Sequence, residues 1–212
     1  MFPSQPAQVL RIHPTHPQQR LIQVAVDILN RGGVVIAPTD VSYALLCNLT
    51  ATKALDQIKR IRQLDDRHHF TLICPNLAEL GSYAQVDNPT YRFLKAHIPG
   101  PYTFLLTANR QVPRRLQHPK KKTIGLRVPE HPILHQLLEK IGEPIFSTTL
   151  KMPNEEEPLA DPEEIIERLE KQVDCIIDGG WSQPGVTTII DLTGSNPECV
   201  REGVGVSPYF KC

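Results

Sequence analysis

Residues 32–48, GGVVIAPTDVSYALLCN, carry the clearest signal of the fold class. The glycine pair is expected to end a helix over residues 17–31, because glycine accepts left-handed backbone geometry at low cost. Val34 to Ala37 then forms a short apolar run, and Ser42 to Cys47 forms a second one. Such runs, bounded by turn residues, are typical of buried strands. A helix followed directly by buried strands indicates an α/β protein.

The rest of the chain continues this alternation of helices and strands. Further helices are expected near residues 51–62, 89–97, 132–141 and 162–171. Further strands are expected at residues 70–74, 102–108, 123–128, 145–149, 173–177, 187–192 and 199–201. The last strands follow one another closely, so we expect a mixed parallel and antiparallel sheet with flanking helices. A single domain over residues 1–212, with its core at about 14–206, accounts for the length.

Composition narrows the class of protein. A hydrophobic content of 40% fits a globular chain, and 23 basic against 23 acidic residues give zero net charge, which argues against an avid nucleic-acid binder. Five separated cysteines without a C-x-x-C pair argue against a disulfide framework and a zinc knuckle. No apolar run approaches the roughly 20 residues of a membrane helix, and no secretory signal is visible. We therefore expect a reduced, cytoplasmic protein without a membrane partner.

The zero net charge conceals two oppositely charged segments. Residues 88–129 carry nine basic and no acidic side chains, whereas residues 139–178 carry twelve acidic and four basic ones. Such an asymmetry indicates an anionic partner for the basic segment. The candidate nucleic-acid contacts in that segment are Arg114, Arg115, Lys120, Lys121 and Lys122. The alternative is that the two segments form oppositely charged surfaces that only keep the protein soluble.

Polar side chains that could carry chemistry follow or interrupt the expected strands. They are Thr39 after the first strand, Arg127 in an otherwise apolar strand, the run Ser147 to Thr149 with Lys151, and Thr188. Ligands of α/β sheets bind at strand ends, and a buried arginine requires an anionic partner. A capped turn or the preference of threonine for strands explains some of these residues equally well.

Two arginines end the helix expected over residues 51–62. The fork of Arg60 or Arg62 suits phosphate or carboxylate, although cations at a helix end also complement the helix dipole. No phosphate-binding Walker loop, serine triad or histidine pattern with metal-ligand spacing occurs. We therefore expect no tightly bound metal.

Details such as IRQL (61–64), FTLIC (70–74), VPRRL (112–116), KKTIGLRVP (121–129) and DPEEIIERLEKQVD (161–174) resemble the YciO branch of the YrdC/YciO family more closely than YrdC itself. Eight segments, taken in order, resemble the family as a whole. They are GGVVIAPTDVSYALLCN (32–48), IKRIRQL (58–64), PGPYTFLL (99–106), TIGLRVPEHP (123–132), PIFSTT (144–149), DCIIDGGW (174–181), TTIIDLT (187–193) and VREGVG (200–205). The resemblance implies a YrdC/RibB-like twisted mixed sheet enclosing a large, concave, basic cavity. It also implies a nucleotidyltransferase that makes threonylcarbamoyl-AMP from ATP with Mg²⁺, L-threonine and bicarbonate, for threonylcarbamoyladenosine modification of tRNA.

The resemblance also assigns roles to residues of this chain. Thr39, Arg127 and Ser147 would hold threonine, and Arg62 and Arg127 would be catalytic. The phosphates would be held by Arg60, Arg62, Thr149, Lys151 and Thr188. The sequence departs from the family on this nucleotide side, where the usual K-x-R is Arg60-Ile61-Arg62 and the usual S-x-N is Thr149-Leu150-Lys151. A lysine in place of asparagine is a donor-only cation.

Two other functions remain open from the sequence. One is a protein that binds nucleotides, tRNA or double-stranded RNA without this turnover, which the basic segment favours. The other is a hydrolase that removes threonylcarbamoyl groups from tRNA and uses the threonine side of the site without ATP.

Overall fold

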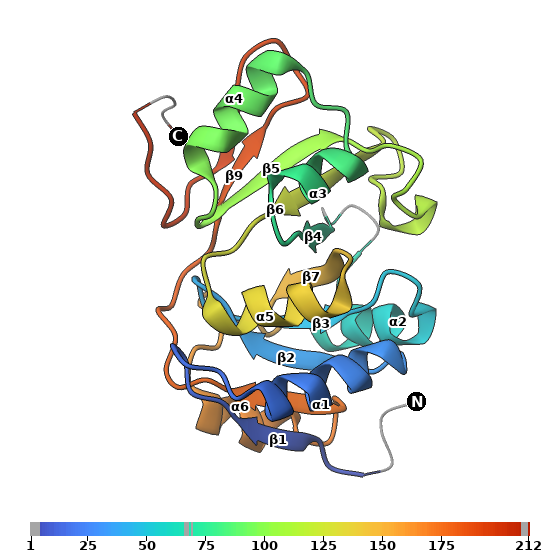
Figure 1. The fold of residues 1–212 in the computed structure, drawn as a ribbon, viewed down its shortest axis with the longest axis vertical. Helices are drawn as coiled ribbons and strands as arrows, with labels where there is room; N and C mark the ends of the chain where they lie inside the picture. Colours follow the sequence, from blue (N-terminus) through green and yellow to red (C-terminus); the bar gives the residue numbers. More distant parts are fainter. Residues whose placement is uncertain (1–4, 66–67, 69, 209–211) are drawn as a thin grey trace.

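The segment 32–48 forms a hairpin inside a long mixed sheet (Figure 1). The computed structural model describes residues 5–65, 68, 70–208 and 212. Helix α1 (Gln19–Asn30) ends before Gly32, whose φ of 82° is left-handed, as the glycine pair predicts. Strand β2 (Val35–Pro38) follows and pairs antiparallel with β3 (Tyr43–Cys47).

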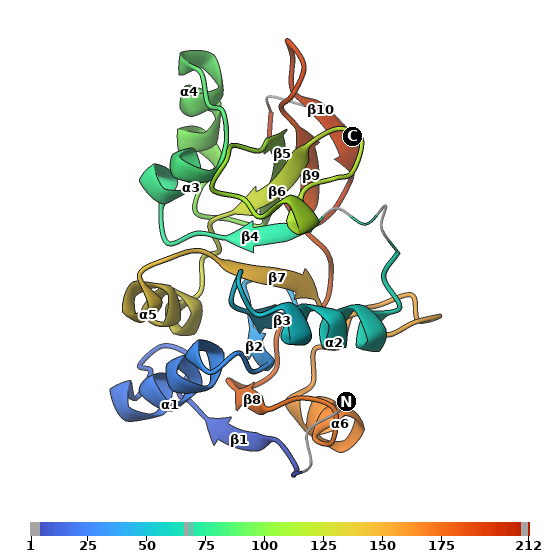
Figure 2. The same ribbon diagram turned by 90° about the vertical axis from the view of Figure 1, so that its right-hand side faces the viewer.

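The described residues form one ten-stranded sheet in the order β1-β8-β2-β3-β7-β4-β6-β5-β9-β10. Its other strands are β1 (Gln8–Arg11), β4 (Thr71–Ile73), β5 (Tyr102–Thr107), β6 (Thr123–Arg127), β7 (Ile145–Thr149), β8 (Cys175–Asp178), β9 (Thr188–Asp191) and β10 (Glu198–Arg201). Parallel pairs, such as β4 with β6, adjoin antiparallel pairs, such as β4 with β7, and the sheet twists along its length (Figure 2). The expectation of a mixed sheet in an α/β fold is confirmed.

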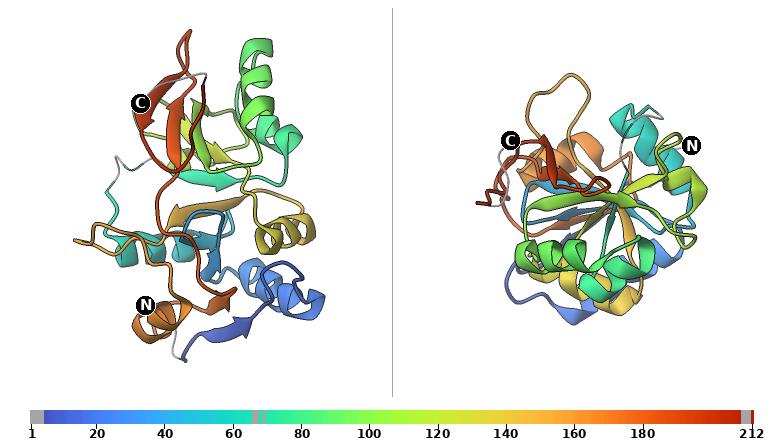
Figure 3. Two further views of the ribbon diagram at one scale, coloured as in Figure 1. Left: turned by 90° about the vertical axis from the view of Figure 1, so that its left-hand side faces the viewer. Right: turned by 90° about the horizontal axis from the view of Figure 1, so that it is seen from above.

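Helices flank the sheet on two sides. On one side lie α1 and α5 (Pro132–Ile141), with α3 (Leu77–Tyr83) and α4 (Asn88–His97) beyond them (Figure 2). On the other side lie α2 (Thr52–Arg62) and α6 (Pro162–Leu169) (Figure 3). None of the helices in the described ranges is long and apolar enough to cross a membrane.

The central strands are apolar on both faces, and each face feeds a different core. In β2, Val35 and Ala37 pack with α1 and α5, whereas Ile36 packs in the cluster that contains residues of α2 and α6. All four residues of β2 are buried. Continuous apolar runs are expected for strands that are covered on both faces. Because helices cover both faces, polar and apolar residues do not alternate along the strands of the hairpin 32–48.

One strand and one α-helix have no counterpart among the elements predicted from the sequence. The edge strand β1 has four residues, of which only Leu10 is buried, so its apolar pattern is weak, and it pairs in parallel with β8. It lies before residue 14, where the predicted core begins. Helix α3 has seven residues, and Gly81 within it lowers helix propensity. Its start is fixed by Asn76, whose side chain accepts a hydrogen bond from the amide of Glu79.

One pair of cysteines differs from the expectation of a fully reduced chain. Cys199 and Cys212 form a disulfide, with their Cα atoms 5.0 Å apart, because the C-terminal end of the chain returns to β10. Cys47, Cys74 and Cys175 are free and buried. The odd number of cysteines therefore does not exclude one local disulfide.

Candidate functional site

The candidate site lies on strands that turn an apolar face to the core and a polar face away from it. Phe104 of β5, Leu126 of β6 and Phe146 of β7 are fully buried in the core. Because side chains alternate along a strand, their neighbours Thr103, Arg127 and Ser147 share the opposite face. The same face is covered further along the sheet by α1 and α5, but not here. The strands therefore present a polar floor.

A cavity of about 290 Å³ opens above this floor. Its lining in the described part of the chain carries four permanent cations and several hydroxyl groups, and no carboxylate. The lining residues are Arg62, His68, Thr71, Thr103, Arg127, Ser147, Thr148, Thr149, Lys151, Val186, Thr187, Ile189 and Arg201. The resemblance implies a large cavity, whereas this volume lies just below the range of about 300–1,000 Å³ for ligand sites. The positive charge of the lining is suited to anionic groups.

Gly125 has no side chain, and this keeps the floor of the cavity free between its neighbours. A Cβ atom on this residue would lie 2.8 Å from the hydroxyl oxygen of Thr71 and 3.1 Å from the methyl carbon of Thr103. Gly125 pairs with Thr71 across β4 and β6, so its backbone forms the floor between two hydroxyl-bearing strands. A larger residue here would collide with these two side chains and with the carbonyl oxygen of Phe70, at 3.0 Å.

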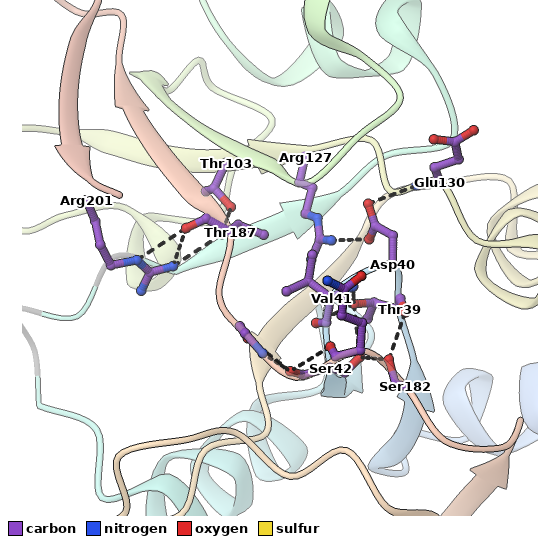
Figure 4. Close-up of polar contacts among 12 residues, drawn as sticks. Thr39, Asp40, Val41, Ser42, Thr103, Arg127, Glu130, Ser182, Thr187 and Arg201 are labelled. Carbon is purple, nitrogen blue, oxygen red and sulfur yellow. Dashed lines mark hydrogen bonds and ion pairs between the residues drawn. The ribbon is translucent and has the colours of Figure 1, made fainter. Parts of the chain in front are cut away.

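Arg127 ends β6 and is 5% exposed. Its guanidinium forms an ion pair with Asp40, whose other carboxylate oxygen accepts a hydrogen bond from the Glu130 amide at 3.3 Å (Figure 4). Burial lowers the pKa of Arg127, and the negative charge of Asp40 opposes that shift. The Nε atom of Arg127 is buried without a hydrogen-bond partner in the described structure. Asp40 is therefore the anionic partner that the sequence requires, and part of the arginine donor set stays available.

A second arginine of the cavity lining, Arg201, comes from the C-terminal part of the chain. Arg201 of β10 donates to the carbonyl oxygen of Thr187 at 2.8 Å and to its hydroxyl oxygen at 3.2 Å. The Thr187 hydroxyl is 2.8 Å from that of Thr103, so the network joins β10 to β5 (Figure 4). Burial lowers the pKa of Arg201. The predicted site does not include Arg201, although it lies in the segment VREGVG that carries the family resemblance.

Two further cations of the lining have no ion-pair partner among the described residues. Burial lowers the pKa of Arg62, and its Nε atom is buried without a hydrogen-bond partner. Lys151 follows β7 and is half-buried beside the hydroxyl groups of that strand. A buried cation without a counter-charge is unfavourable unless an anion binds to it. Arg62, Lys151 and Arg201 therefore give the cavity an unbalanced positive charge.

The structure brings five of the predicted substrate and phosphate residues into this cavity: Arg62, Arg127, Ser147, Thr149 and Lys151. Three others lie outside its lining. The hydroxyl of Thr39 donates to the carbonyl oxygen of Val41 at 2.8 Å within its own turn. The hydroxyl of Thr188 donates to the carbonyl oxygen of Gly205 at 2.7 Å. Arg60 is exposed and donates to the carbonyl oxygen of Asp56.

The five candidate nucleic-acid contacts also differ from one another. The guanidinium of Arg115 donates to the carbonyl oxygen of Leu49, which ties it to the fold. Arg114 begins the 3₁₀ turn η1 (Arg114–Leu116), and with Arg110 and Lys122 it lines a separate hollow of about 930 Å³. The side chains of residues 120–122 are exposed. The basic side chains of this segment therefore lie outside the cavity lining, except for that of Arg127.

Within the described ranges, no group of three or more His, Cys, Asp or Glu side chains could hold a metal ion.

His131, which precedes α5, is close to Asp40 and Arg127. The pKa of His131 is lowered to about 4, chiefly by burial; the charge of Asp40 opposes this shift and the charge of Arg127 adds to it. The ring is therefore neutral near neutral pH.

Comparison with known proteins identifies relatives over most of the chain. A YciO protein of Escherichia coli K12, itself uncharacterized, is 53% identical over 205 residues, which is 96% of this chain and all of that protein. Its crystal structure superposes with a TM-score of 0.94. A threonylcarbamoyl-AMP synthase of Bos taurus is 28% identical over 178 residues, covering 84% of this chain and 60% of the bovine protein.

The fold also matches a more distant solved structure. Sua5 of P. abyssi, crystallised in complex with L-threonine, has a TM-score of 0.84 and 23% identity, and the match covers 92% of this chain and 57% of Sua5. The family model for Sua5, YciO and YrdC, described as telomere recombination, matches residues 27–203. The chain therefore belongs to the Sua5/YciO/YrdC family.

Proposed function

We propose that the cavity binds an anionic substrate of threonylcarbamoyl-adenylate chemistry and transfers AMP from ATP to N-carboxylated threonine. The observation that carries the proposal is a set of three cations, Arg62, Lys151 and Arg201, that line the same cavity as the hydroxyl groups of β7 and form no ion pair with a described residue. The family relation supports the chemistry, because a bovine relative is a threonylcarbamoyl-AMP synthase and Sua5 binds L-threonine.

The reaction needs neutralisation of charge more than a covalent nucleophile. Bicarbonate carboxylates the amine of threonine with loss of water, and a carbamate oxygen then attacks the α-phosphorus of ATP. The bond between the α-phosphorus and its bridging oxygen breaks, and pyrophosphate leaves. Both reactants are anions, so cations placed in advance lower the barrier by reducing their repulsion. ATP enters as its Mg²⁺ complex, and the metal is therefore part of the substrate.

The positions of the side chains divide the proposed roles. Arg127, held by Asp40, and Ser147 on the neighbouring part of the floor would bind the threonine carboxylate. Arg62, Lys151 and Arg201 would face the phosphates. Thr39 would act indirectly in this scheme, because its hydroxyl stabilises the turn that presents Asp40.

The direct test is release of pyrophosphate from ATP in the presence of L-threonine, bicarbonate and Mg²⁺. We expect release that depends on threonine and is lost in Arg127→Ala and in Ser147→Ala. The serine variant removes only a hydroxyl group, so it keeps the fold if the arginine variant does not. Release no faster than that of the Ser147→Ala protein would contradict the proposal.

A second candidate function rests on a different surface. The exposed Lys120, Lys121 and Lys122 lie near the hollow lined by Arg110 and Arg114. Clustered cations of this kind bind the phosphate backbone of RNA without a sequence requirement. This surface could serve tRNA binding with or without turnover in the cavity.

A further inference from the structure

A second cavity, of about 600 Å³, lies where two parallel strands end. β4 and β6 are parallel, so their carboxyl ends meet at the same edge of the sheet. The segments that follow them, Pro75 to Leu77 and Val128 to Pro132, line the cavity together with the end of α4. The carboxyl edge of parallel strands is a common ligand site in α/β proteins.

The lining of this second cavity combines an apolar body with a small number of polar groups. The apolar residues are Pro75, Leu77, Ile98, Pro99, Val128, Pro129 and Pro132. Lys95 is the only cation and Glu130 the only carboxylate of the lining in the described part of the chain, and both side chains are exposed. Neither forms an ion pair with a described residue. A pocket with apolar walls and a few polar groups that fix orientation is typical of small-molecule sites.

One polar atom of this lining is buried without a partner. The Nδ1 atom of His131 makes no hydrogen bond in the described structure. Burial keeps the ring neutral, because it lowers the pKa of His131 to about 4. A neutral imidazole adds no charge to the site. The fixed charges of the cavity are then one positive and one negative.

We propose that the second cavity binds a free α-amino acid with an apolar side chain. The carboxylate of the ligand would pair with Lys95, its ammonium group with Glu130, and its side chain would pack against the proline-rich wall. A monocarboxylate would leave Glu130 unmatched, and an amine would leave Lys95 unmatched. This site is separate from the proposed synthase cavity, and its test requires no turnover.

The second cavity is connected to the first through one short segment. The amide of Glu130 donates to Asp40, and Asp40 pairs with Arg127 in the first cavity (Figure 4). A ligand that contacts Glu130 therefore lies next to the backbone amide that is hydrogen-bonded to Asp40. The amide signals of Glu130 and His131 are the natural reporters of binding.

The experiment is a titration of ¹⁵N-labelled full-length protein followed by NMR. The probes are L-leucine, isocaproate, which lacks the ammonium group, and isopentylamine, which lacks the carboxylate. We expect saturable shifts of the Glu130 and His131 amides with leucine, and binding at least about tenfold weaker for each of the other two probes. Absence of saturation with leucine, or equal affinity for either half-molecule, would overturn the proposal.

Matched variants locate the binding. His135→Trp places a larger ring in the cavity from an exposed position of α5, and Glu139→Trp makes the same change one turn further along, outside the lining. We expect leucine binding to be lost only in His135→Trp. Lys95→Met should weaken it about tenfold, whereas Arg92→Met on the same helix should not. Shifts that survive His135→Trp, or that vanish in Ser147→Ala, would place leucine elsewhere and reject the site.

Discussion

Arg127 and Asp40 form a nearly buried ion pair, with side-chain exposures of 6% and 12%, between the end of β6 and the turn that follows β2. The two residues are far apart in sequence, and their pairing fixes the guanidinium at the rim of the cavity floor. The pair uses only part of the arginine donor set, since Nε has no partner in the described structure. Asp40 is thus expected to affect stability and, under the proposed function, the position of the arginine that would bind the substrate carboxylate.

Replacing Asp40 with Asn should destabilise the protein. The substitution leaves the Arg127 charge buried without a counter-charge, which costs about 3 kcal/mol in comparable buried pairs. The measurement is the free energy of unfolding from denaturant titration. Glu164→Gln is the control, because it breaks an exposed ion pair with Arg168 and should cost less than about 1 kcal/mol. Equal losses in the two variants would contradict a structural role for the Asp40 pair.

His131 should make stability depend on pH. Its folded-state pKa is lowered from 6.5 to about 4, so the unfolded chain binds the proton more tightly. The contribution is complete above pH 6.5 and is lost as the pH falls towards 4. At about pH 5 the loss is on the order of 2 kcal/mol.

The measurement for His131 is the free energy of unfolding at pH 7 and pH 5. His131→Gln should reduce the difference between these two values, and His135→Gln, which removes an exposed imidazole of the same region, serves as the control. A difference that is the same in wild type and His131→Gln would show that another group is responsible.

Replacing Arg62 should weaken ligand binding without destabilising the protein, whereas replacing Arg60 should leave ligand binding nearly unchanged. Arg62→Met removes a cavity cation whose Nε atom is buried without a partner among the described residues, so the free energy of unfolding should stay the same or rise. Binding of pyrophosphate, measured by calorimetry, should weaken about tenfold or more, as expected for loss of a charged contact. Arg60→Met, on the exposed side of the same helix, should change the affinity less than about twofold. Equal effects of the two variants would reject the assignment of Arg62 to the cavity.

The contrast between these two arginines shows what the sequence can predict. Residues two apart on a helix point about 200° apart, so only one of them can face the sheet. The helix continues through Arg62 and ends at Gln63, whose φ is 50°. The pattern of residues 51–62 places the helix, but the side that faces the cavity depends on packing against strands distant in sequence.

The other site residues also differ in whether the sequence alone could place them in the cavity. Arg127 and Ser147 interrupt or follow apolar strands, and period-two alternation is enough to place them on one polar face. The Thr39 hydroxyl is instead held by its own turn, an arrangement that cannot be distinguished from a ligand site by residue type alone. Arg201 could not be placed, because its position depends on pairing of the short edge strand β10 with β9 and on contact with Thr187.

Neutralising the exposed lysines should test the RNA surface independently of the cavity. The triple variant Lys120→Gln, Lys121→Gln and Lys122→Gln removes three cations that make no contribution to the cavity lining. If they contact phosphates, the logarithm of the RNA affinity should depend less steeply on salt, by about two to three in the slope, because fewer counterions are released. Fluorescence anisotropy with tRNA and with duplex RNA at several salt concentrations measures this slope. Lys171→Gln, in the acidic segment, is the control.

Arg115 lies in the same basic segment, but its replacement should affect stability more than RNA binding. Its guanidinium donates to the carbonyl oxygen of Leu49, so Arg115→Gln should lower the free energy of unfolding by about 1–2 kcal/mol. It should change the salt dependence of RNA binding less than any one of the three lysines does. A salt slope that responds to Arg115→Gln and not to the triple lysine variant would reject the lysines as the RNA contact. It would assign the contact instead to the side of η1 that faces Leu49.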